Sequence, residues 1–266
     1  MAFNPYKNSF DIFDPDLIMY LGLVAAQKRN EDATKYISRI MPFGQKEFFI
    51  RSCDNDLLYQ ENCQELLSEA LFKFDSYSLT VEQLHAIRNA KNYKIPPESL
   101  SMLEGENYDE FLHRALLDNA LMEAQSFMEM YLRYVAFFSA REKFRYSNTH
   151  KMLEKIKASK SQIAKEAYEY LTSNVYSKCQ KTDPKLWGDY LTELRNTTTH
   201  EKQLELSNHE VIYPLGRSRT EITYQNQPIA RFMQDIENNI VFMLHSMFQI
   251  LYGLTWDDAR EKIKQN

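Results

Sequence analysis

The sequence predicts an all-α fold: a four-helix bundle in the second half of the chain, an extra helical region before it, and a small β-hairpin ahead of the last long helix. Only six of the 266 residues are glycine and eight are proline, so few residues interrupt helices. Hydrophobic residues make up 44% of the chain, which is enough for a packed core. Long stretches repeat these residues at helical spacing.

Residues 1–100 are predicted to form an N-terminal helical region. Its helices are expected shortly after residue 15 and over residues 36–41, 54–72 and 81–92. Thr80 would cap the last of them, because its hydroxyl can accept a backbone hydrogen bond. Two adjacent prolines within residues 94–99 cannot continue a helix. We therefore place a boundary there, before a second domain at residues 105–266.

The second domain begins with one long helix, predicted from Tyr108 to Phe144. At 1.5 Å per residue it would span about 55 Å. Its seam alternates spacings of four and three, as in a helix bundle, at Leu117, Leu121, Ala124, Met128, Tyr131, Val135 and Phe138. A second apolar row lies beside the seam, at Phe127, Met130, Tyr134 and Phe137. A helix that is apolar on two sides packs against more than one partner.

Two further helices, a hairpin and a last long helix complete the predicted domain. One helix is expected over residues 149–176, and another after Asp183-Pro184, which would supply its N-cap and first residue. Residues 211–213 and 221–224 are rich in β-formers and flank a Pro-Leu-Gly turn, so they predict the hairpin. Pro228 would open the last helix, whose apolar stripe is Ile229, Phe232, Met233, Ile236, Ile240, Leu244, Met247 and Leu251.

The net charge of −5 argues against a protein that binds nucleic acid over its whole surface. Residues 141–165 are the exception, with eight Lys or Arg and two Glu. Such a face could hold a phosphate backbone, or it could be an ordinary solvated helix surface. If it binds RNA, the expected contacts come from Arg141, Lys143, Arg145 and Lys151.

Cysteine usage and hydropathy predict a cytoplasmic protein that does not enter a membrane. Cys53, Cys63 and Cys179 show no metal-ligand spacing, and a sparse, odd number is typical of a reducing compartment. The first residues lack the charged-then-apolar pattern of a secretion signal. The most apolar stretch, residues 240–254, is too short to span a bilayer.

Residues 184–200 carry the strongest candidates for functional side chains. On a regular helix one face is apolar and belongs in the core, with Leu186, Trp187, Tyr190, Leu191 and Leu194. Arg195 falls on the flank of that face. The opposite, polar face carries Asp189, Glu193, Asn196 and His200. Three threonines at 197–199 lose rotamer freedom in a helix and are expected to loosen its last turn.

An arginine and a histidine placed together suit the cleavage of RNA without a metal. Arg195 is a permanent cation that can grip a phosphate through a fork of donors, and His200 can exchange a proton near neutral pH. We expect Arg195, Asn196 and His200 to be catalytic, Asp189 and Glu193 to support them, and no metal or cofactor to take part. The alternative is structural: an ion pair, a surface amide and a histidine favoured at a helix C-terminus.

The spacing of Arg195 and His200 occurs a second time, at Arg145 and His150. This second pair straddles a predicted helix break and has no asparagine after the arginine. We interpret it as a coincidence or as a pair of RNA-contacting residues.

The stretch Arg195-Asn196-Thr-Thr-Thr-His200, with the helix order over about residues 105–255, resembles the HEPN superfamily. The signature of that family is an arginine, a polar residue, a few more residues and a histidine. The resemblance implies a four-helix up-and-down bundle that forms a homodimer with the two motifs facing each other. It also implies a metal-independent endoribonuclease, acting as a toxin or antiviral-defence effector on RNA. We expect such an effector to be held in check by its own acidic N-terminal half or by an antitoxin or regulatory partner. Residues 1–100 and the hairpin lie outside the minimal family pattern.

Two other functions fit the same residues. A non-catalytic HEPN-like bundle would use Arg195, Arg145 and the basic face to bind RNA or a nucleotide, or to dock a partner. A purely structural adaptor would leave Arg195 and His200 facing solvent separately. The nuclease alone requires a second copy, because one histidine cannot act as acid and base at the same time.

Overall fold

The computed structural model describes residues 57–89, 108–141, 148–177, 185–198, 204–213, 217–255 and 257–258, and the fold is given for these residues. Within them the chain is mainly helical, with one small three-stranded sheet. The predicted fold class is confirmed at this level. The predicted boundary at residues 94–99 and the helices predicted before residue 57 lie outside the described residues.

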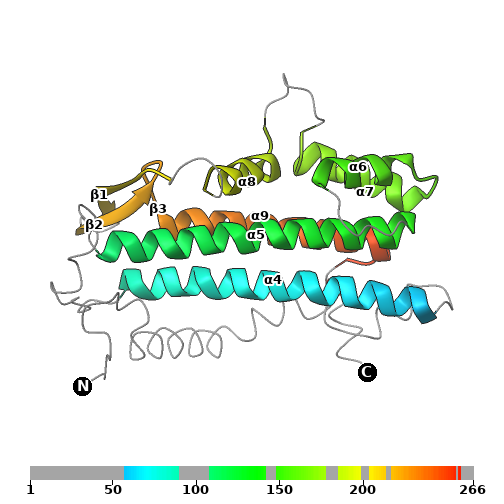
Figure 1. Cartoon of the computed structure of the whole chain (residues 1–266), viewed down its shortest axis with the longest axis horizontal. Coiled ribbons are helices and arrows are strands. Elements are labelled where there is room, and N and C mark those ends of the chain that lie inside the picture. The colour runs from blue at the N-terminus through cyan, green and yellow to red at the C-terminus, as the bar shows by residue number, and fades with distance from the viewer. Residues whose placement is uncertain are drawn as a thin grey trace.

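Three long helices lie side by side along the molecule (Figure 1). They are α4 (Leu57–Asn89), α5 (Tyr108–Ala140) and α9 (Ile229–Tyr252). α4 runs antiparallel to α5, because Tyr59 donates to the carbonyl of Phe138 at one end (2.6 Å) and Asn119 donates to Thr80 towards the other (3.0 Å). α9 runs in the same direction as α5, and its last residue, Tyr252, hydrogen-bonds to Tyr134.

Aromatic side chains fill the core between the long helices. Neighbouring rings lie 5.4–5.8 Å apart along a path from Phe74 through Phe127, Tyr131 and Tyr134 to Phe138. These separations are within the range in which aromatic pairs attract each other. Burial raises the pKa of Tyr77, Tyr131 and Tyr134 well above the ordinary value of 10.0.

Two hydrogen bonds tie α4 to α9 inside this core. Tyr77 donates to the carbonyl of Met233 (2.5 Å), and the Ser78 hydroxyl donates to the Glu237 carboxylate (2.7 Å). Gln234 also donates to Glu237. Glu237 is only 9% exposed, so neutral donors satisfy a nearly buried carboxylate.

Short elements form a second layer along α5 (Figure 1). From the N-terminal to the C-terminal end of α5 they follow in the order sheet, α8, then α6 with α7. The elements are α6 (Thr149–Ala158), α7 (Gln162–Asn174), α8 (Trp187–Asn196), β1 (Leu206–Tyr213), β2 (Arg217–Tyr224) and β3 (Gln227–Pro228). The strands pair antiparallel in that order, with Leu206 opposite Tyr224. Arg114 of α5 donates to the carbonyl of Leu204, at 2.9 Å, just before the sheet.

The helical periodicity read from the sequence is confirmed. All residues of the predicted seam on α5 are buried, and so is the second row apart from the partly buried Met130. Every residue of the stripe predicted on α9 is buried, and Pro228 is the N-cap of that helix. The hairpin is confirmed and is longer than the β-forming residues alone indicated. Local spacing therefore identified the faces that pack.

Three predicted boundaries are wrong. Thr80 lies inside α4 rather than at a cap, because its hydroxyl donates to the carbonyl of Ser76 four residues earlier (3.0 Å) and accepts from Asn119. The single helix expected over residues 149–176 is divided into α6 and α7, because the Ser161 hydroxyl accepts from a backbone N–H and caps a new helix. α5 ends at Ala140 rather than at residue 144, because the next residue, Arg141, adopts a left-handed φ of 56°.

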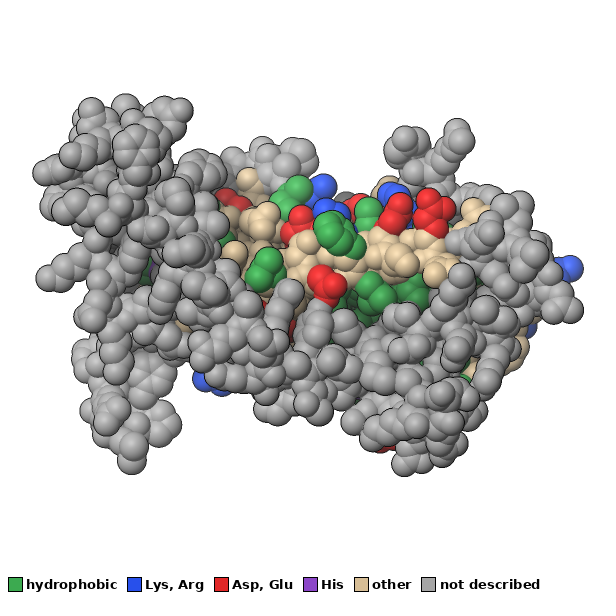
Figure 2. Space-filling model, turned by 90° about the horizontal axis from the view of Figure 1, so that it is seen from below, with side chains coloured by type: hydrophobic (Ala, Val, Ile, Leu, Met, Phe, Trp, Pro, Cys, Tyr) green, Lys and Arg blue, Asp and Glu red, His purple; other side chains and the backbone are tan. Residues whose placement is uncertain are grey.

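The core is continuous from α4 through α5 to α9. Three of the described helices, α4, α5 and α9, are long. The short helices α6, α7 and α8 pack on the side of α5 that faces away from α4. The four-helix up-and-down arrangement is thus not confirmed. Figure 2 views the molecule from the side of α4, where described side chains of mixed kinds, hydrophobic and acidic among them, reach the surface. None of the described helices is both long enough and apolar enough to cross a membrane.

Candidate functional site

The N-terminal end of α8 is fixed against the end of α7. The N–H of Gly188 donates to the carbonyl of Val175 at 2.9 Å. A Cβ atom at Gly188 would lie 2.7 Å from that same oxygen, so this close approach requires glycine. α8 begins at Trp187, later than the predicted start after Pro184, and residue 184 itself lies outside the described residues.

Asp189 explains the later start of α8. Its carboxylate accepts from the backbone N–H and the hydroxyl of Ser177, both at 2.6 Å, and from the N–H of Leu186 at 3.3 Å. A carboxylate in the first turn of a helix satisfies its unpaired N–H groups and favours its dipole. Asp189 was expected to support catalysis, and the structure places it in this capping and bridging role.

Glu193, the second expected supporting carboxylate, lies on the outer side of α8. It pairs with Lys185 at 2.6 Å, and the two side chains are 51% and 59% exposed. An ion pair this exposed contributes little to stability. On the inner side, the Thr192 hydroxyl donates to Gln125 of α5 at 3.2 Å and holds the helix in place.

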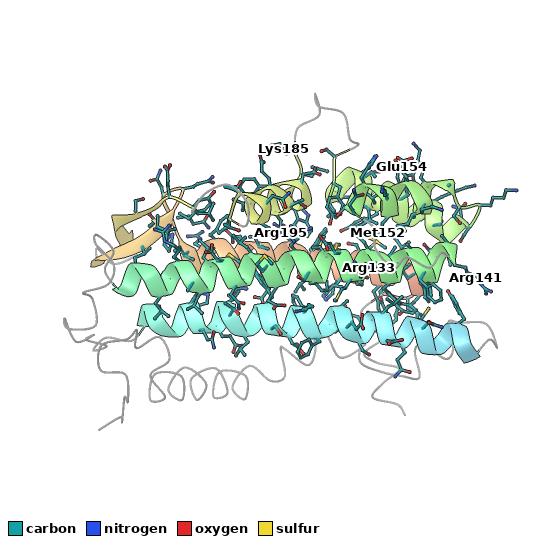
Figure 3. All side chains as sticks on the ribbon, viewed as in Figure 1. Arg133, Arg141, Met152, Glu154, Lys185 and Arg195 are labelled. Atoms are coloured by element: carbon teal, nitrogen blue, oxygen red, sulfur yellow. The ribbon has the colours of Figure 1, made fainter. Side chains whose placement is uncertain are left out.

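Arg195 and Asn196 contact each other at the C-terminal end of α8. The guanidinium donates from Nη1 to the side-chain oxygen of Asn196 at 3.0 Å. Arg195 is half-buried, as its predicted flank position requires, and Figure 3 shows it on the side of α8 that faces α5. Lys185 lies on the outer side in the same view. The structure therefore places a partly sheltered cation beside an exposed amide.

The last turn of α8 is wider than a regular α-helical turn. Residues 197–198 have π-helical geometry, and the Thr197 N–H is shared between the carbonyls of Glu193 and Leu194. The Thr198 hydroxyl donates to the carbonyl of Arg195 at 2.9 Å. The loosening expected from the threonines is confirmed at these two residues. Such wide turns are frequent at functional sites.

The remaining predicted site residues do not lie beside Arg195 and Asn196 in the described part of the chain. His200, Lys143 and Arg145 lie outside the described residues. Arg141 is exposed at the end of α5, with its guanidinium 4.8 Å from the centre of the Tyr59 ring, and Lys151 is exposed in the first turn of α6. The structure thus brings Arg195 and Asn196 together, and it places Arg141 at the far end of α5 (Figure 3).

Lysines are concentrated on α6, on α7 and between them. We call the exposed residues Lys151, Lys155, Lys157, Lys160 and Lys165 the lysine face. Exposed glutamates, among them Glu154 and Glu166, lie between these lysines. Lys157 lies 5.8 Å from the centre of the Tyr168 ring, close enough for a cation–π contact. The face is basic but not purely so.

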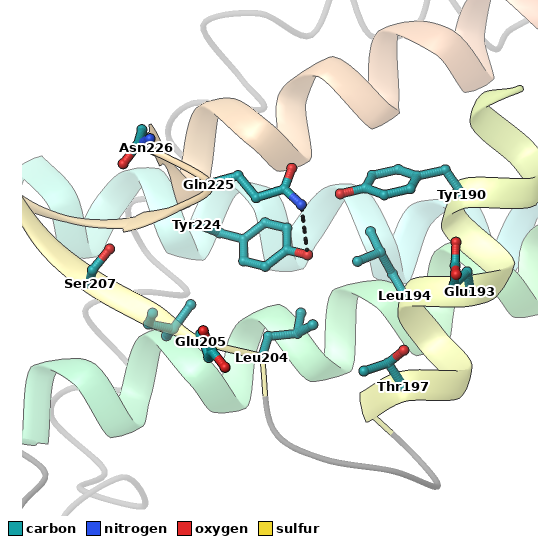
Figure 4. Close-up of a pocket in the computed structure, with 11 residues that line it drawn as sticks. Tyr190, Glu193, Leu194, Thr197, Leu204, Glu205, Ser207, Tyr224, Gln225 and Asn226 are labelled. Carbon is teal, nitrogen blue, oxygen red and sulfur yellow. Dashed lines mark hydrogen bonds between the residues drawn. The ribbon is translucent and has the colours of Figure 1, made fainter. Parts of the chain in front are cut away.

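A pocket lies between α8 and the sheet, and the sequence did not predict it (Figure 4). It has a volume of about 630 Å³ and is lined by Tyr190, Glu193, Leu194, Thr197, Leu204, Glu205, Leu206, Ser207, Tyr224, Gln225 and Asn226. Tyr190 and Tyr224 point their hydroxyls towards each other. Burial and the neighbouring Tyr190 hydroxyl raise the pKa of Tyr224, so it stays a neutral hydrogen-bonding group at neutral pH.

The rim of the pocket includes a tight turn between β2 and β3. Tyr224 pairs with Gln227, and the two residues between them, Gln225 and Asn226, have left-handed φ values of 50° and 63°. Two positive φ values define the type I′ turn that suits a two-residue hairpin. The Gln225 amide donates to the Tyr224 hydroxyl at 3.2 Å. The signal in the sequence was the polar Gln-Asn pair between a β-forming run and Pro228.

Among the described residues, no group of three or more His, Cys, Asp or Glu side chains is arranged to hold a metal ion. No family model, curated protein or solved structure matches this chain.

Proposed function

We propose that this protein is a metal-independent endoribonuclease of the HEPN type that acts as a toxin or antiviral-defence effector. The observation that carries the proposal is the contact between Arg195 and Asn196 at the widened end of α8. Asn196 accepts from Nη1 of the guanidinium, and this hydrogen bond orients the cation at the end of α8. His200 follows in the sequence, two residues after the wide turn.

The chemistry needs only groups that this motif and RNA supply. His200 takes the proton of the RNA 2′-hydroxyl, and the 2′-oxygen attacks the adjacent phosphorus. The bond from phosphorus to the 5′-oxygen breaks, and that oxygen receives a proton from a second imidazole. Arg195 stabilises the negative charge that builds on the phosphate oxygens. The products are a 2′,3′-cyclic phosphate and a 5′-hydroxyl end.

A homodimer supplies the second imidazole in this scheme. Two copies related by a twofold axis would place a pair of Arg195–His200 motifs over one phosphate. The lysine face would then add contacts to the RNA backbone beyond the reacting phosphate, because Lys side chains bind phosphates and release their counterions. An antitoxin or regulatory partner would hold the dimer inactive.

The direct test is cleavage of single-stranded RNA by the purified full-length chain in the presence of a metal chelator. We expect 2′,3′-cyclic phosphate ends, and a rate at least about 100-fold lower for His200→Ala and for Arg195→Ala. The matched control is His85→Ala, which removes a partly exposed histidine of α4, a helix with no proposed role in RNA binding, and should leave the rate unchanged. Equal rates for wild type and His200→Ala would overturn the proposal.

A second candidate function is favoured by the sheltered position of Arg195. A half-buried guanidinium that already contacts Asn196 suits the stable gripping of a phosphate, without catalysis, by an RNA- or nucleotide-binding module. Such a module would bind RNA in a salt-dependent manner and leave it intact. The cleavage assay separates the two candidates, because the binding module predicts intact RNA in every sample.

A further inference from the structure

The pocket between α8 and the sheet has the size of a small-ligand site. Its volume of about 630 Å³ lies within the range that such sites occupy. Leucine and tyrosine side chains form much of its wall, and hydroxyl and amide groups project between them (Figure 4). None of the described lining residues is lysine or arginine, so this part of the wall offers no cation to a phosphate.

The charged side chains among the described lining residues lie at the rim of the pocket and are negative. Glu193 is half-exposed and pairs with Lys185, and Glu205 is exposed. An anionic ligand would be repelled by these two carboxylates. Both carboxylates are exposed and Glu193 already pairs with Lys185, so an ion pair with a cationic ligand would be weak. A neutral, flat ligand with hydrogen-bonding edges fits both the apolar wall and the polar rim.

We propose that this pocket binds the base of a single-stranded nucleotide, with guanine preferred, an inference that rests on the proposed function because it assigns the base specificity of the RNA substrate. Proteins read unpaired bases by stacking them on aromatic rings and bonding to their edges. Tyr190 supplies a half-buried ring, and Tyr224, whose ring packs against Phe232, supplies its hydroxyl. The carboxylates of Glu193 and Glu205 are pure acceptors.

Guanine is the base whose edge matches an acceptor carboxylate. Its N1–H and N2 amino group are adjacent donors, so one carboxylate can accept from both. Adenine and cytosine place a ring-nitrogen acceptor beside their amino group, and uracil flanks its N–H with two carbonyls. Those lone pairs would face the carboxylate oxygens and repel them. The amides of Gln225 and Asn226 can donate to the remaining acceptors of guanine.

The left-handed turn gives the amide its position. Glutamine rarely adopts a positive φ, and here the pairing of Tyr224 with Gln227 imposes it. The result is an amide 3.2 Å from the Tyr224 hydroxyl at the pocket. Backbone held in a rare conformation is more frequent at ligand sites than elsewhere.

The test is calorimetric titration of the full-length chain with guanosine, adenosine, cytidine and uridine, which carry no phosphate. We expect one saturable guanosine site that is at least about tenfold tighter than for the other nucleosides, and a further tenfold loss in Glu205→Gln. Glu154→Gln is the matched control, since it makes the same charge change on an exposed residue of α6. It should leave guanosine binding unchanged.

Three results would overturn the inference. They are no saturable guanosine binding by a folded protein, equal affinity for all four nucleosides, and tighter binding of a tri-arginine peptide at the same site. RNA cleavage on the same preparations separates the two proposals. Cleavage without guanosine binding removes the base site and keeps the nuclease, whereas guanosine binding without cleavage keeps the base site and removes the nuclease.

Discussion

The three-helix core and the α8–sheet end of the molecule are built on different principles. In the core, α4, α5 and α9 bury contiguous aromatic and aliphatic rows, and inter-helix hydrogen bonds satisfy buried groups such as Glu237. At the α8–sheet end, short elements hold exposed polar side chains, a wide helical turn and two left-handed residues around a pocket. Stability is therefore expected to reside in the first region and recognition in the second.

The largest expected difference appears at alkaline pH. Tyr77, Tyr131 and Tyr134 have raised pKa values in the folded core, whereas in the unfolded chain they ionise near pH 10. Below about pH 10 the three tyrosines keep their protons in both the folded and the unfolded chain, so their ionisation does not lower the free energy of unfolding. Above it the unfolded chain alone loses them, so the free energy of unfolding falls by about 4 kcal/mol per pH unit for three tyrosines.

We expect one cooperative transition in which tyrosinate absorbance rises as helical circular dichroism is lost. A gradual rise of tyrosinate absorbance while the helical signal persists would show that these tyrosines ionise in the folded protein. That outcome would contradict the burial of these three side chains in the folded core.

The next largest effect compares two phenylalanines. Phe127→Ala should lower the free energy of unfolding by about 3–5 kcal/mol, because the ring is fully buried and contacts Phe74 and Tyr131. Phe242→Ala on α9 is the control and should cost about 0.5 kcal/mol or less, since that side chain is 68% exposed. Denaturant unfolding measures both. Equal losses would contradict the difference in burial between the two rings.

A smaller effect is expected at the junction of α7 and α8. Asp189→Ala removes the acceptor of three hydrogen bonds, from Ser177 and Leu186, and should cost about 1–2 kcal/mol. Glu193→Ala, one turn later, should cost about 0.5 kcal/mol or less, because its ion pair is exposed. Thermal unfolding of the two variants checks the difference. A larger loss for Glu193→Ala would refute the capping role of Asp189.

The smallest effect has the opposite sign. Replacing Gln225-Asn226 by Asn-Gly supplies the residues that a type I′ turn prefers and should stabilise the protein by about 0.5–1 kcal/mol. The same change removes the Gln225 amide from the pocket, so guanosine affinity should fall while stability rises. Unfolding and calorimetry on one variant measure both quantities. A variant that is less stable would show that Gln225 is not held in a costly conformation.

Sequence reasoning succeeded where packing follows local spacing and failed where it depends on distant partners. The buried rows of α5 and α9 were predicted because each row repeats within one helix. Thr80 has the residue type of a cap, yet Asn119 of another helix holds it inside α4. Asp189 lies on the same face as Glu193, but its carboxylate turns to Ser177, twelve positions earlier. No helical wheel contains that information.

The candidate site was predictable to the same degree. The loosened turn after Asn196 follows from neighbouring residues and was predicted, whereas the hydrogen bond from Arg195 to Asn196 was not. The catalytic role of His200 stays a prediction. The pocket was missed because Tyr190 and Tyr224 come from different elements, and Tyr190 was assigned wholly to the core although it is half-buried and lines the pocket.

α5 separates the two surfaces proposed to bind nucleic acid, which are the pocket between α8 and the sheet and the lysine face on α6 and α7. Its 33 residues carry the sheet near one end and α6 with α7 near the other, and the ends of such a helix lie about 50 Å apart. Because α5 packs against several other helices, it cannot bend enough to bring its two ends together. We therefore expect a mononucleotide to occupy either the pocket or the lysine face, and only longer strands to gain avidity from both.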